Sequence, residues 1–280
     1  RQGTGADPQF VAATREGFPV LDGVASFLRG VRALFDYRDH QARARGASPI
    51  APAAAVNSWR RRLQDGQPLD EHGALGMLAD FGLPANTGHI VESEAAALVA
   101  AHELGYPVAL KTAVPGIDHK SDRDGVRLGL AADALLATAW RDLASQIGPR
   151  ALVSPMVTGT GVELLLGMIH DPQFGPVVVI GAGGVHVEAL ADAVYALPPF
   201  DAAEARRLVA RLRIAPLLAS RRHRRPLAVD AFCEAVARFS ALAAELGELF
   251  AEIDLNPVIV HADGCTIVDA LFVLQARQAS

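Results

Sequence analysis

The sequence has few lysines, few cysteines and no long apolar run. Only two of its 26 basic residues are lysines, Lys111 and Lys120, and all the others are arginines. Cys233 and Cys265 have no metal-ligand spacing and no catalytic setting, so we expect a reduced, cytoplasmic chain. The longest apolar runs are far shorter than the ~20 residues that a bilayer-spanning helix needs, so we expect no membrane partner.

The charge balance argues against binding to nucleic acid. With 31 acidic residues against 26 basic ones, the chain has a formal net charge of −5 and a pI near 6.0. Sequence-independent binding of nucleic acid needs a basic surface instead. The 280 residues, 51% of them hydrophobic, can fill the core of one large domain or of two moderate ones.

The first 57 residues differ in pattern from the rest of the chain. Residues 17–21 predict a short strand, and apolar residues at helical spacing predict a helix over 24–43. The stretch 46–57 contains no charged residue and predicts a linker, which places a boundary near residue 57. Because the sequence begins with Arg1 rather than Met, we expect a piece of a longer protein.

Beyond residue 57, helices alternate with short β-rich runs. A helix predicted over 68–81 ends before Gly82, whose tolerance of positive φ suits a C-terminal cap. The pattern is typical of an α+β or α/β fold with two lobes, and no period indicates internal repeats. Further strands are expected at 108–111, 125–130, 152–156, 162–169, 177–181, 258–261 and 266–268, and further helices at 93–104, 132–147, 202–212 and 229–250.

The first segment that suggests chemistry contains both lysines. Lys111 ends an apolar strand, where an anionic partner would explain a cation among inward-facing neighbours; a lysine that reaches solvent from a strand edge is the plainer alternative. The composition favours a functional role, because this chain uses arginine for almost every other cation. His119 is either an exposed loop histidine or a nucleophile that carries a phosphoryl group, and the residues alone leave this open.

Glycines and glutamates mark a second segment, from residue 159 to residue 188. The run Gly181-Ala-Gly-Gly184 follows an apolar strand and is either a tight turn or a place where backbone N–H groups approach an anion. The sequence has neither a P-loop nor a dinucleotide-binding fingerprint here. Glu163 and Glu188 lie within apolar runs, where a carboxylate usually has a partner: an arginine, a ribose hydroxyl or a cation.

Oxygen donors gather in a third segment near the end of the chain. Asp254 and Asn256 alternate along an apolar strand, and Asp263-Gly264 predicts a hairpin turn that returns the chain towards Asp269. Residues two apart lie on one face of a strand, so these donors can face the same side. Oxygen ligands of this kind are those that Mg²⁺ selects, and the pattern predicts a magnesium site.

Taken together, the segments resemble the ATP-grasp domain of the ADP-forming (NDP-forming) acyl-CoA synthetases, relatives of succinyl-CoA synthetase. The matching pieces are LDEHGALGMLADFGLPA, GYPVALK, HKSD, GVELLLGMIHDPQFGPVVVIGAGGVHVE, EIDLNPVIV and VDA, in this order along the chain. The opening FPVLDGVASFLRGVRALFDY resembles the tail of the CoA-ligase-like domain that precedes this one in fused members. The resemblance implies a small lobe at about 86–158 and a large lobe formed by about 58–85 and 159–280.

The resemblance also implies a reaction and a role for each motif residue. Such enzymes reversibly interconvert acyl-CoA, ADP and phosphate with the acid, CoA and ATP, and His119 would relay the phosphoryl group. Asp254 would orient the phosphohistidine, while Asn256 and Asp269 would hold Mg²⁺. The partners would be CoA-binding and CoA-ligase-like domains of the same or a companion chain, and the oligomeric state is left open. The nucleotide site would comprise Lys111, Lys120, Gly125, Met156, Val157, Thr158, Glu163, Gly183, Gly184 and Glu188.

Three departures from the family pattern support a second hypothesis. Where the family usually has HKSDVGGV, this chain has HKSDRDGV, so Asp124 places a carboxylate near the phosphates unless Arg123 or a metal compensates it. Two arginines of the family are replaced by Ala196 and Leu271. The alternative is a degenerate ATP-grasp module with a regulatory or scaffolding role in a larger multidomain protein, such as one that bears an acyltransferase.

Overall fold

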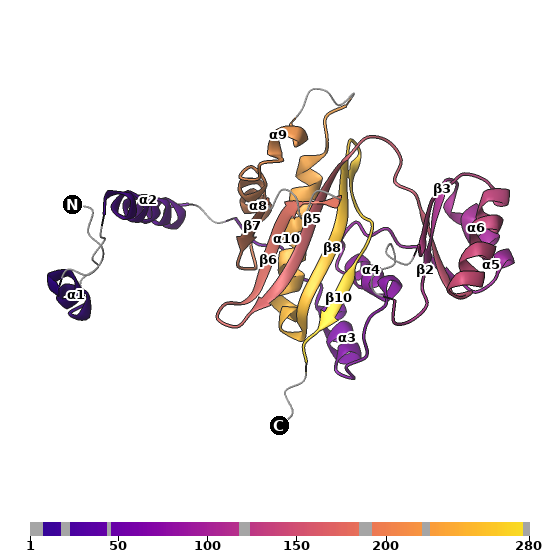
Figure 1. Cartoon of the computed structure of the whole chain (residues 1–280), viewed down its shortest axis with the longest axis horizontal. Helices are drawn as coiled ribbons and strands as arrows, with labels where there is room; N and C mark the ends of the chain where they lie inside the picture. Colours follow the sequence, from indigo (N-terminus) through magenta and orange to yellow (C-terminus); the bar gives the residue numbers. More distant parts are fainter. Residues whose placement is uncertain are drawn as a thin grey trace. The chain divides into compact units, whose positions relative to one another are not determined.

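Two units make up the chain in the computed structural model, Arg1–Arg45 and Gly46–Ser280 (Figure 1). The structure describes residues 8–17, 23–43, 46–117, 124–184, 192–219 and 225–276. No helix within these ranges is long and apolar enough to cross a bilayer.

The first unit contains the helices α1 (Pro8–Arg15) and α2 (Val24–Gln41). Helix α2 forms where the apolar spacing predicts it, and none of its residues is buried. Its apolar side chains, such as Phe27 and Leu34, are exposed. Of the strand predicted over 17–21, only Gly17 lies within the described residues.

The second unit begins with a segment that differs from the prediction of a linker over 46–57. Helix α3 (Ala53–Leu63) starts there after Pro52, because consecutive alanines favour a helix. Its face formed by Val56, Trp59 and Leu63 is buried in the main core. The uncharged stretch 46–57 therefore contains a short connection and the first turn of α3, which packs against the main core.

Helix α4 (Glu71–Asp80) follows, close to the predicted range of 68–81. The Asp70 side chain caps it by accepting a hydrogen bond from the Gly73 N–H at 2.9 Å. Gly82 adopts φ 72° just beyond the last turn, as its predicted capping role requires. Leu75 and Leu78 anchor the helix in the core, so its first turn has a fixed position.

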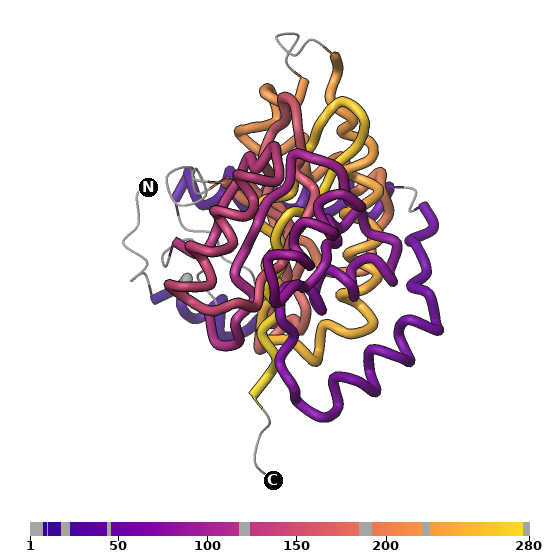
Figure 2. The backbone as a smooth tube through the Cα atoms, turned by 90° about the vertical axis from the view of Figure 1, so that its right-hand side faces the viewer, coloured from indigo at the N-terminus to yellow at the C-terminus, as the bar shows by residue number. Residues whose placement is uncertain are grey.

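A four-stranded antiparallel sheet, in the order β1-β4-β2-β3, forms one lobe of this unit. The helices α5 (Glu94–Leu104) and α6 (Asp133–Gln146) pack on it, as the right side of Figure 1 shows, and Figure 2 views the unit from that side. Leu110, Leu136 and Val153 are buried in its separate core. Its strands are β1 (His89–Val91), β2 (Val108–Thr112), β3 (Val126–Leu130) and β4 (Ala151–Pro155).

The other lobe is built on a larger antiparallel sheet, in the order β10-β8-β5-β6-β7 with β9 paired to β8. The helices α8 (Ala202–Val209) and α10 (Val229–Leu246) pack on one of its faces (Figure 1). The short α9 (Ala215–Leu218) lies between them in the sequence. Its strands are β5 (Val162–Asp171), β6 (Gly175–Ala182), β7 (Ala193–Ala196), β8 (Phe250–His261), β9 (Gly264–Ile267) and β10 (Leu271–Leu274).

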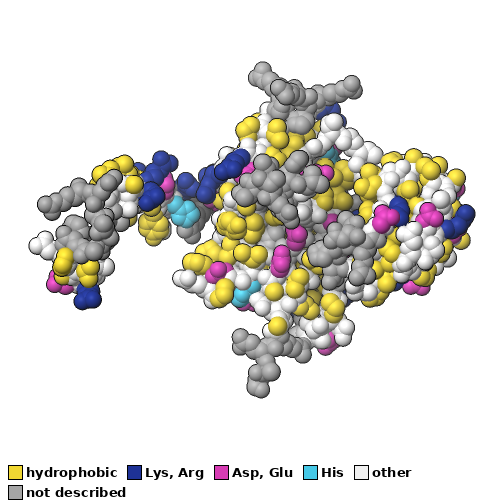
Figure 3. Space-filling model, in the orientation of Figure 1, with side chains coloured by type: hydrophobic (Ala, Val, Ile, Leu, Met, Phe, Trp, Pro, Cys, Tyr) yellow, Lys and Arg dark blue, Asp and Glu magenta, His cyan; other side chains and the backbone are white. Residues whose placement is uncertain are grey.

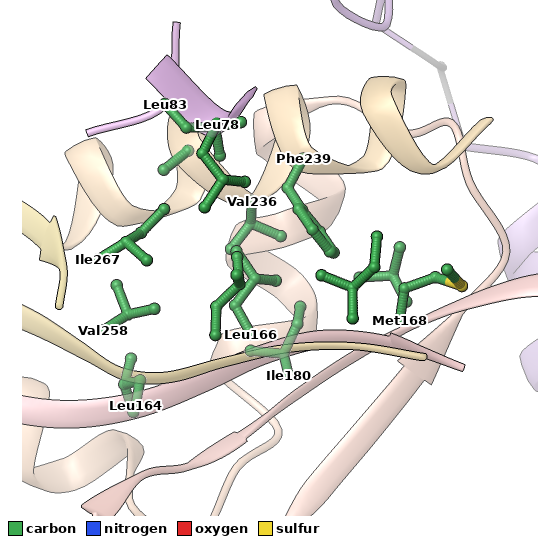
Figure 4. Packing of buried hydrophobic residues seen from close by; sticks show 14 of the residues in the cluster. Leu78, Leu83, Leu164, Leu166, Met168, Ile180, Val236, Phe239, Val258 and Ile267 are labelled. Atoms are coloured by element: carbon green, nitrogen blue, oxygen red, sulfur yellow. The ribbon is translucent and has the colours of Figure 1, made fainter. Parts of the chain in front are cut away.

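The alternation along β5 decides which face carries the core and which is left for function. Leu164, Leu166 and Met168 are fully buried and lie against Val236 and Phe239 of α10 (Figure 4). Each such side chain contributes about 1.5–3 kcal/mol when it is fully buried. The residues between them point to the opposite face of the sheet, which the helices leave open.

The predicted helix 229–250 is shorter in the structure, and the strand after it is longer. Helix α10 ends at Leu246, a 3-10 turn covers Gly247–Leu249, and β8 begins at Phe250. Phe250, Ile253 and Leu255 are buried in the core. Tertiary packing therefore favours an extended conformation from Phe250 onward, although the local apolar spacing predicts a helix as far as residue 250. The short strands β1, β7 and β10 and the helix α9 were not expected from the sequence.

Candidate functional site

Lys111 lies where the two lobes meet. It is on β2, and its side chain is only 5% exposed. Its Nζ donates to Glu71 Oε1 at 2.6 Å and to the Val268 carbonyl at 3.0 Å, and it lies 3.4 Å from Asp269 Oδ2. The ammonium therefore connects the four-stranded sheet to α4 and to the chain that follows β9.

Electrostatics keep this lysine charged in spite of its burial. Burial lowers the pKa of Lys111, but the carboxylates of Asp269 and Glu71 raise it by more, so that the pKa lies above its ordinary value. The ammonium is thus a buried cation with two anionic neighbours. The sequence alternative of a lysine that extends into solvent is wrong.

Asp254 lies on the open face of the larger sheet. In the register of the strands it stands opposite Gly167 on one side and Leu271 on the other. A Cβ on Gly167 would lie 2.7 Å from the Ile253 carbonyl oxygen, so the close approach of β8 to β5 beside Asp254 requires glycine. Burial raises the pKa of Asp254, and the negative charges of Glu252 and Asp269 raise it further, to about 6.

Accessible apolar side chains share this face of the sheet with Asp254 and Glu252. Ile169, Tyr195 and Val273 are 41%, 60% and 40% exposed. Figure 3 shows apolar and acidic side chains next to each other over this side of the molecule. The half-buried carboxylate thus lies on a surface that another chain segment can cover.

Asn256, the next oxygen donor along β8, lies in a β-bulge, which changes the direction of its side chain. The pairing with β5 shifts between Leu164 and Leu166, because β8 has one more residue than β5 in this stretch. Asn256 Oδ1 accepts a hydrogen bond from the Gly184 N–H at 3.0 Å. This contact brings the end of β6 next to the donor-bearing strand.

The glycines at the end of β6 are required by close packing against β5. The Gly183 N–H donates to the Glu163 carbonyl at 3.0 Å, and a Cβ on Gly183 would lie 2.5 Å from the Leu164 carbonyl carbon. Gly184 adopts φ 64°, and the Glu163 carboxylate occupies the space that its Cβ would need. The sequence segments that contain Glu163, Gly183, Gly184 and Asn256 thus come together in one place.

Three residues of the expected nucleotide site lie in the connection between the two sheets. Met156, Val157 and Thr158 follow the last residue of β4 and precede β5, so they connect the two lobes. The Met156 N–H donates to the Pro107 carbonyl at 3.0 Å, and Met156 Sδ accepts from the Gly129 N–H at 3.1 Å. Backbone groups of this connection are therefore held in place beside the four-stranded sheet.

A cavity of about 950 Å³ adjoins the lysine cluster. Its lining includes Glu71, Asp269 and Asn256, together with Arg62 and Arg150. Arg150 pairs with Asp70 at 3.0 Å and donates to the Ala113 carbonyl. A volume of this order is typical of sites for small ligands.

The loop before β3 carries the substitution that set this chain apart from the family pattern. Asp124 adopts φ 52°, a conformation that glycine takes more readily. Its carboxylate accepts a hydrogen bond from Arg127 Nη2 at 2.9 Å. Arg127 therefore compensates this charge, whereas Arg123 lies outside the described residues. The Gly125 carbonyl accepts from the Thr112 N–H at 2.8 Å and fixes the loop to β2.

Oxygen donors near the cavity suit a hard divalent cation. Asp269 is 41% exposed, and both Asp269 and Asn256 line the cavity. Within the described ranges, no group of three or more His, Cys, Asp or Glu residues forms a metal centre. Two protein oxygens completed by phosphate and water oxygens are a usual set for Mg²⁺, so the donors fit this ion.

Some predicted site residues are not covered by the description, and some contacts were missed. His119, Lys120 and Glu188 lie outside the described residues. Sequence reasoning did not find Glu71 and its contact with Lys111. The Asp70-Glu71 pair indicates a helix start, and no local signal links it to a strand 40 residues later.

Comparison with known proteins gives the class. The ATP-grasp domain family matches residues 61–274, most of the second unit. The chain therefore belongs to the ATP-grasp family, as its sequence segments and its mixed α/β fold predict.

Within this family, two similar proteins are named as CoA ligases that form ADP. The chain is 33% identical over 217 residues to "Acetate--CoA ligase [ADP-forming] I subunit beta" of Pyrococcus furiosus, covering 75% of this chain and 93% of the relative. It is 36% identical over 211 residues to "4-hydroxybutyrate--CoA ligase [ADP-forming]" of Nitrosopumilus maritimus, covering 72% of this chain and 30% of that longer relative.

A solved structure gives the same answer. Acetyl-coenzyme A synthetase 1 of Ca. Korarchaeum cryptofilum, in complex with coenzyme A and Mg-AMPPCP, superposes with a TM-score of 0.68 and 32% identity. The superposition covers 79% of this chain and 100% of that chain. Its phosphohistidine segment is described as pointing towards the nucleotide binding site. The family predicted from the sequence is confirmed.

Proposed function

We propose that this chain is the nucleotide-binding, phosphoryl-relaying part of an ADP-forming acyl-CoA synthetase. The full reaction converts acyl-CoA, ADP and phosphate to acid, CoA and ATP, and it is reversible. The observation that carries the proposal is the meeting of Lys111 and Asp269, from different lobes, beside a cavity lined by oxygen donors. Phosphoryl transfer depends mainly on such positioning and on neutralisation of phosphate charge.

The described residues have distinct parts in this proposal. Lys111 offers its ammonium to nucleotide phosphates, and the backbone at 156–158 contacts the adenine. Glu163, Gly183 and Gly184 line the nucleotide. Asn256 and Asp269 would hold Mg²⁺, which supplies positive charge to the phosphates when it is bound.

His119 is the proposed nucleophile of the relay. A ring nitrogen of His119 attacks the γ-phosphorus of ATP, the bond to the β-phosphate oxygen breaks, and ADP leaves with that electron pair. Asp254 accepts the N–H of the other ring nitrogen and so orients the ring. The remaining nucleotide contacts of the proposal are Lys120, Gly125 and Glu188.

Partner domains complete the reaction in this proposal. The acyl and CoA chemistry belongs to CoA-binding and CoA-ligase-like domains, in the same or a companion chain, because one relative is a β subunit and this chain matches only 30% of another. The open sheet face around Asp254, with Ile169 and Tyr195, is the surface we assign to a partner segment. Two free cysteines, both buried, support a reducing compartment such as the cytoplasm.

Labelling tests the relay directly. The chain is incubated with γ-labelled ATP and Mg²⁺, and acid-labile, base-stable label is measured on wild type, H119A and D254N. We expect label on wild type, none on H119A and strongly reduced label on D254N. Equal labelling of wild type and H119A would show that the relay residue is misassigned.

A second candidate function is supported by the departures at Asp124, Ala196 and Leu271. In this alternative the chain is a degenerate ATP-grasp module that regulates or scaffolds a larger protein. Leu271 faces Asp254 across the strands β10 and β8, so an arginine of the family pattern is missing next to the proposed relay carboxylate. Nucleotide binding without any transfer of label would favour this alternative.

A further inference from the structure

Within the described part of the chain, the acceptors around the Lys111 ammonium come from the opposite lobe. Lys111 belongs to the four-stranded sheet, whereas Glu71 is on α4 and Val268 and Asp269 follow β9 of the larger sheet. An ammonium has three N–H donors, and three acceptors lie within 3.4 Å of it. A nucleotide phosphate must therefore compete with these acceptors.

The two carboxylates at the lysine differ in how far a ligand can reach them. The Asp269 side chain is 41% exposed, so it can turn to a cation or solvent in the cavity. The Glu71 side chain is 4% exposed and lies closest to the ammonium, at 2.6 Å. Asp269 is thus the exchangeable neighbour, and Glu71 is the permanent one.

Local structure fixes Glu71 in this position. It is the first residue of α4, directly after the capping residue Asp70, and the helix is anchored by buried leucines. Next to it, Asp70 and Arg150 form a second ion pair between α4 and the four-stranded sheet. A buried carboxylate costs desolvation free energy, and pairing with a cation offsets only part of that cost. An apolar residue at position 71 would fill the same space without it, so the presence of Glu71 beside Lys111 favours a functional role.

We propose that Glu71 is a positioning residue of the nucleotide site: it holds the Lys111 ammonium at the junction of the lobes and weakens its attraction for phosphate. The inference rests on the proposed role of Lys111 in nucleotide binding. The ammonium and the two carboxylates give these three side chains a net charge of −1, and Glu71 supplies one of the two negative charges beside Lys111. Glu71 thus has two separable effects on Lys111: it fixes the position of the ammonium, and it weakens the attraction of the ammonium for phosphate.

Two substitutions separate these effects because they act in opposite directions. Glu71→Gln keeps an oxygen acceptor of the same shape at 2.6 Å from Nζ but removes the negative charge. Glu71→Ala removes both, so the ammonium loses its position. The first change strengthens binding of a nucleoside diphosphate, and the second weakens it.

The experiment measures dissociation constants of ADP and adenosine by calorimetry, with the whole 280-residue chain in EDTA. We expect ADP to bind E71Q about tenfold more tightly and E71A about tenfold more weakly than wild type, and adenosine to bind all three equally. The matched control is E94Q, because Glu94 is also the first residue of a helix and is paired with an arginine, Arg141, at 2.7 Å, away from the cavity. It should match wild type.

Three results would overturn the inference: E71Q binds ADP as wild type does, both Glu71 variants shift ADP binding in the same direction, or adenosine binding changes in parallel with ADP binding. E71Q alone decides the electrostatic part if E71A does not fold. A K111Q variant separates the inference from the function on which it rests. If ADP does not bind wild type, or binds K111Q equally well, the nucleotide role fails and the inference fails with it; if ADP binding needs Lys111 but ignores Glu71, only the inference fails.

Discussion

Asp254→Asn should stabilise the folded chain at neutral pH while it strongly reduces phosphoryl transfer. The pKa of the Asp254 carboxyl is raised from 3.8 to about 6, first by burial and then by Glu252 and Asp269. A carboxyl group whose pKa is higher in the folded than in the unfolded state destabilises the fold at any pH where it is ionised. For Asp254 this free-energy penalty is complete above the folded-state pKa of about 6, declines as the pH falls, and disappears below the unfolded-state pKa of about 3.8.

The magnitude follows from these two pKa values. At about 1.36 kcal/mol for each pH unit, they give a penalty of about 3 kcal/mol, which we reduce to about 2 kcal/mol because the side chain is only half-buried. Asparagine has the same shape without the charge. D254N should therefore be more stable than wild type by about 2 kcal/mol at about pH 7.5 and by about 1 kcal/mol at about pH 5.

Urea denaturation of wild type and D254N at both pH values, in EDTA, measures this difference. E94Q is the control, because Arg141 lowers the pKa of Glu94 and its neutralisation should give no gain. Finding D254N less stable than wild type at pH 7.5, or finding the same difference at both pH values, would refute the reasoning. Greater stability together with strongly reduced labelling is the pattern of a residue kept for function.

Three further predictions follow from the described contacts. D124G relieves the left-handed backbone strain at residue 124 but loses the ion pair with Arg127, so the unfolding free energy should change by less than about 0.5 kcal/mol. Because a carboxylate is removed, calorimetry should show tighter ADP binding, and weaker ADP binding would contradict this. G183A forces a Cβ against the backbone of Leu164, so ADP affinity should fall at least tenfold, and unchanged affinity would remove that turn from the site. Phe239→Ala empties a fully buried position and should cost about 3–5 kcal/mol in urea denaturation; a cost below about 1 kcal/mol would mean that this core is loosely packed.

Much of the fold follows from local pattern. The β-rich run at 162–169 predicts β5, and the Asp263-Gly264 turn between β8 and β9 is where the sequence indicates it. Where the prediction differs, tertiary packing decides the conformation. The helix predicted to end at residue 250 ends at Leu246, and the strand that carries Asp254 and Asn256 begins at Phe250, because β5 and β10 offer hydrogen-bonding partners on both sides.

The candidate site follows from the sequence only in part. Motif order and spacing select Lys111, Asp254, Asn256 and Asp269, and the structure places the first and last of these in contact. Glu71 could not be selected in the same way, since its significance depends on a contact between α4 and β2 that no spacing encodes. The compensation of Asp124 by Arg127 also depends on the loop conformation, and the sequence alone suggested a different arginine.

Calorimetric titration of Mg-ADP into wild type and K111Q tests the central claim most directly. If the junction of the two lobes is a nucleotide site, wild type binds one ADP per chain, and the K111Q variant binds it at least about tenfold more weakly because a buried ammonium no longer meets the phosphates. Equal binding by the two proteins, or no binding by wild type, would contradict the assignment of this cleft to a nucleotide.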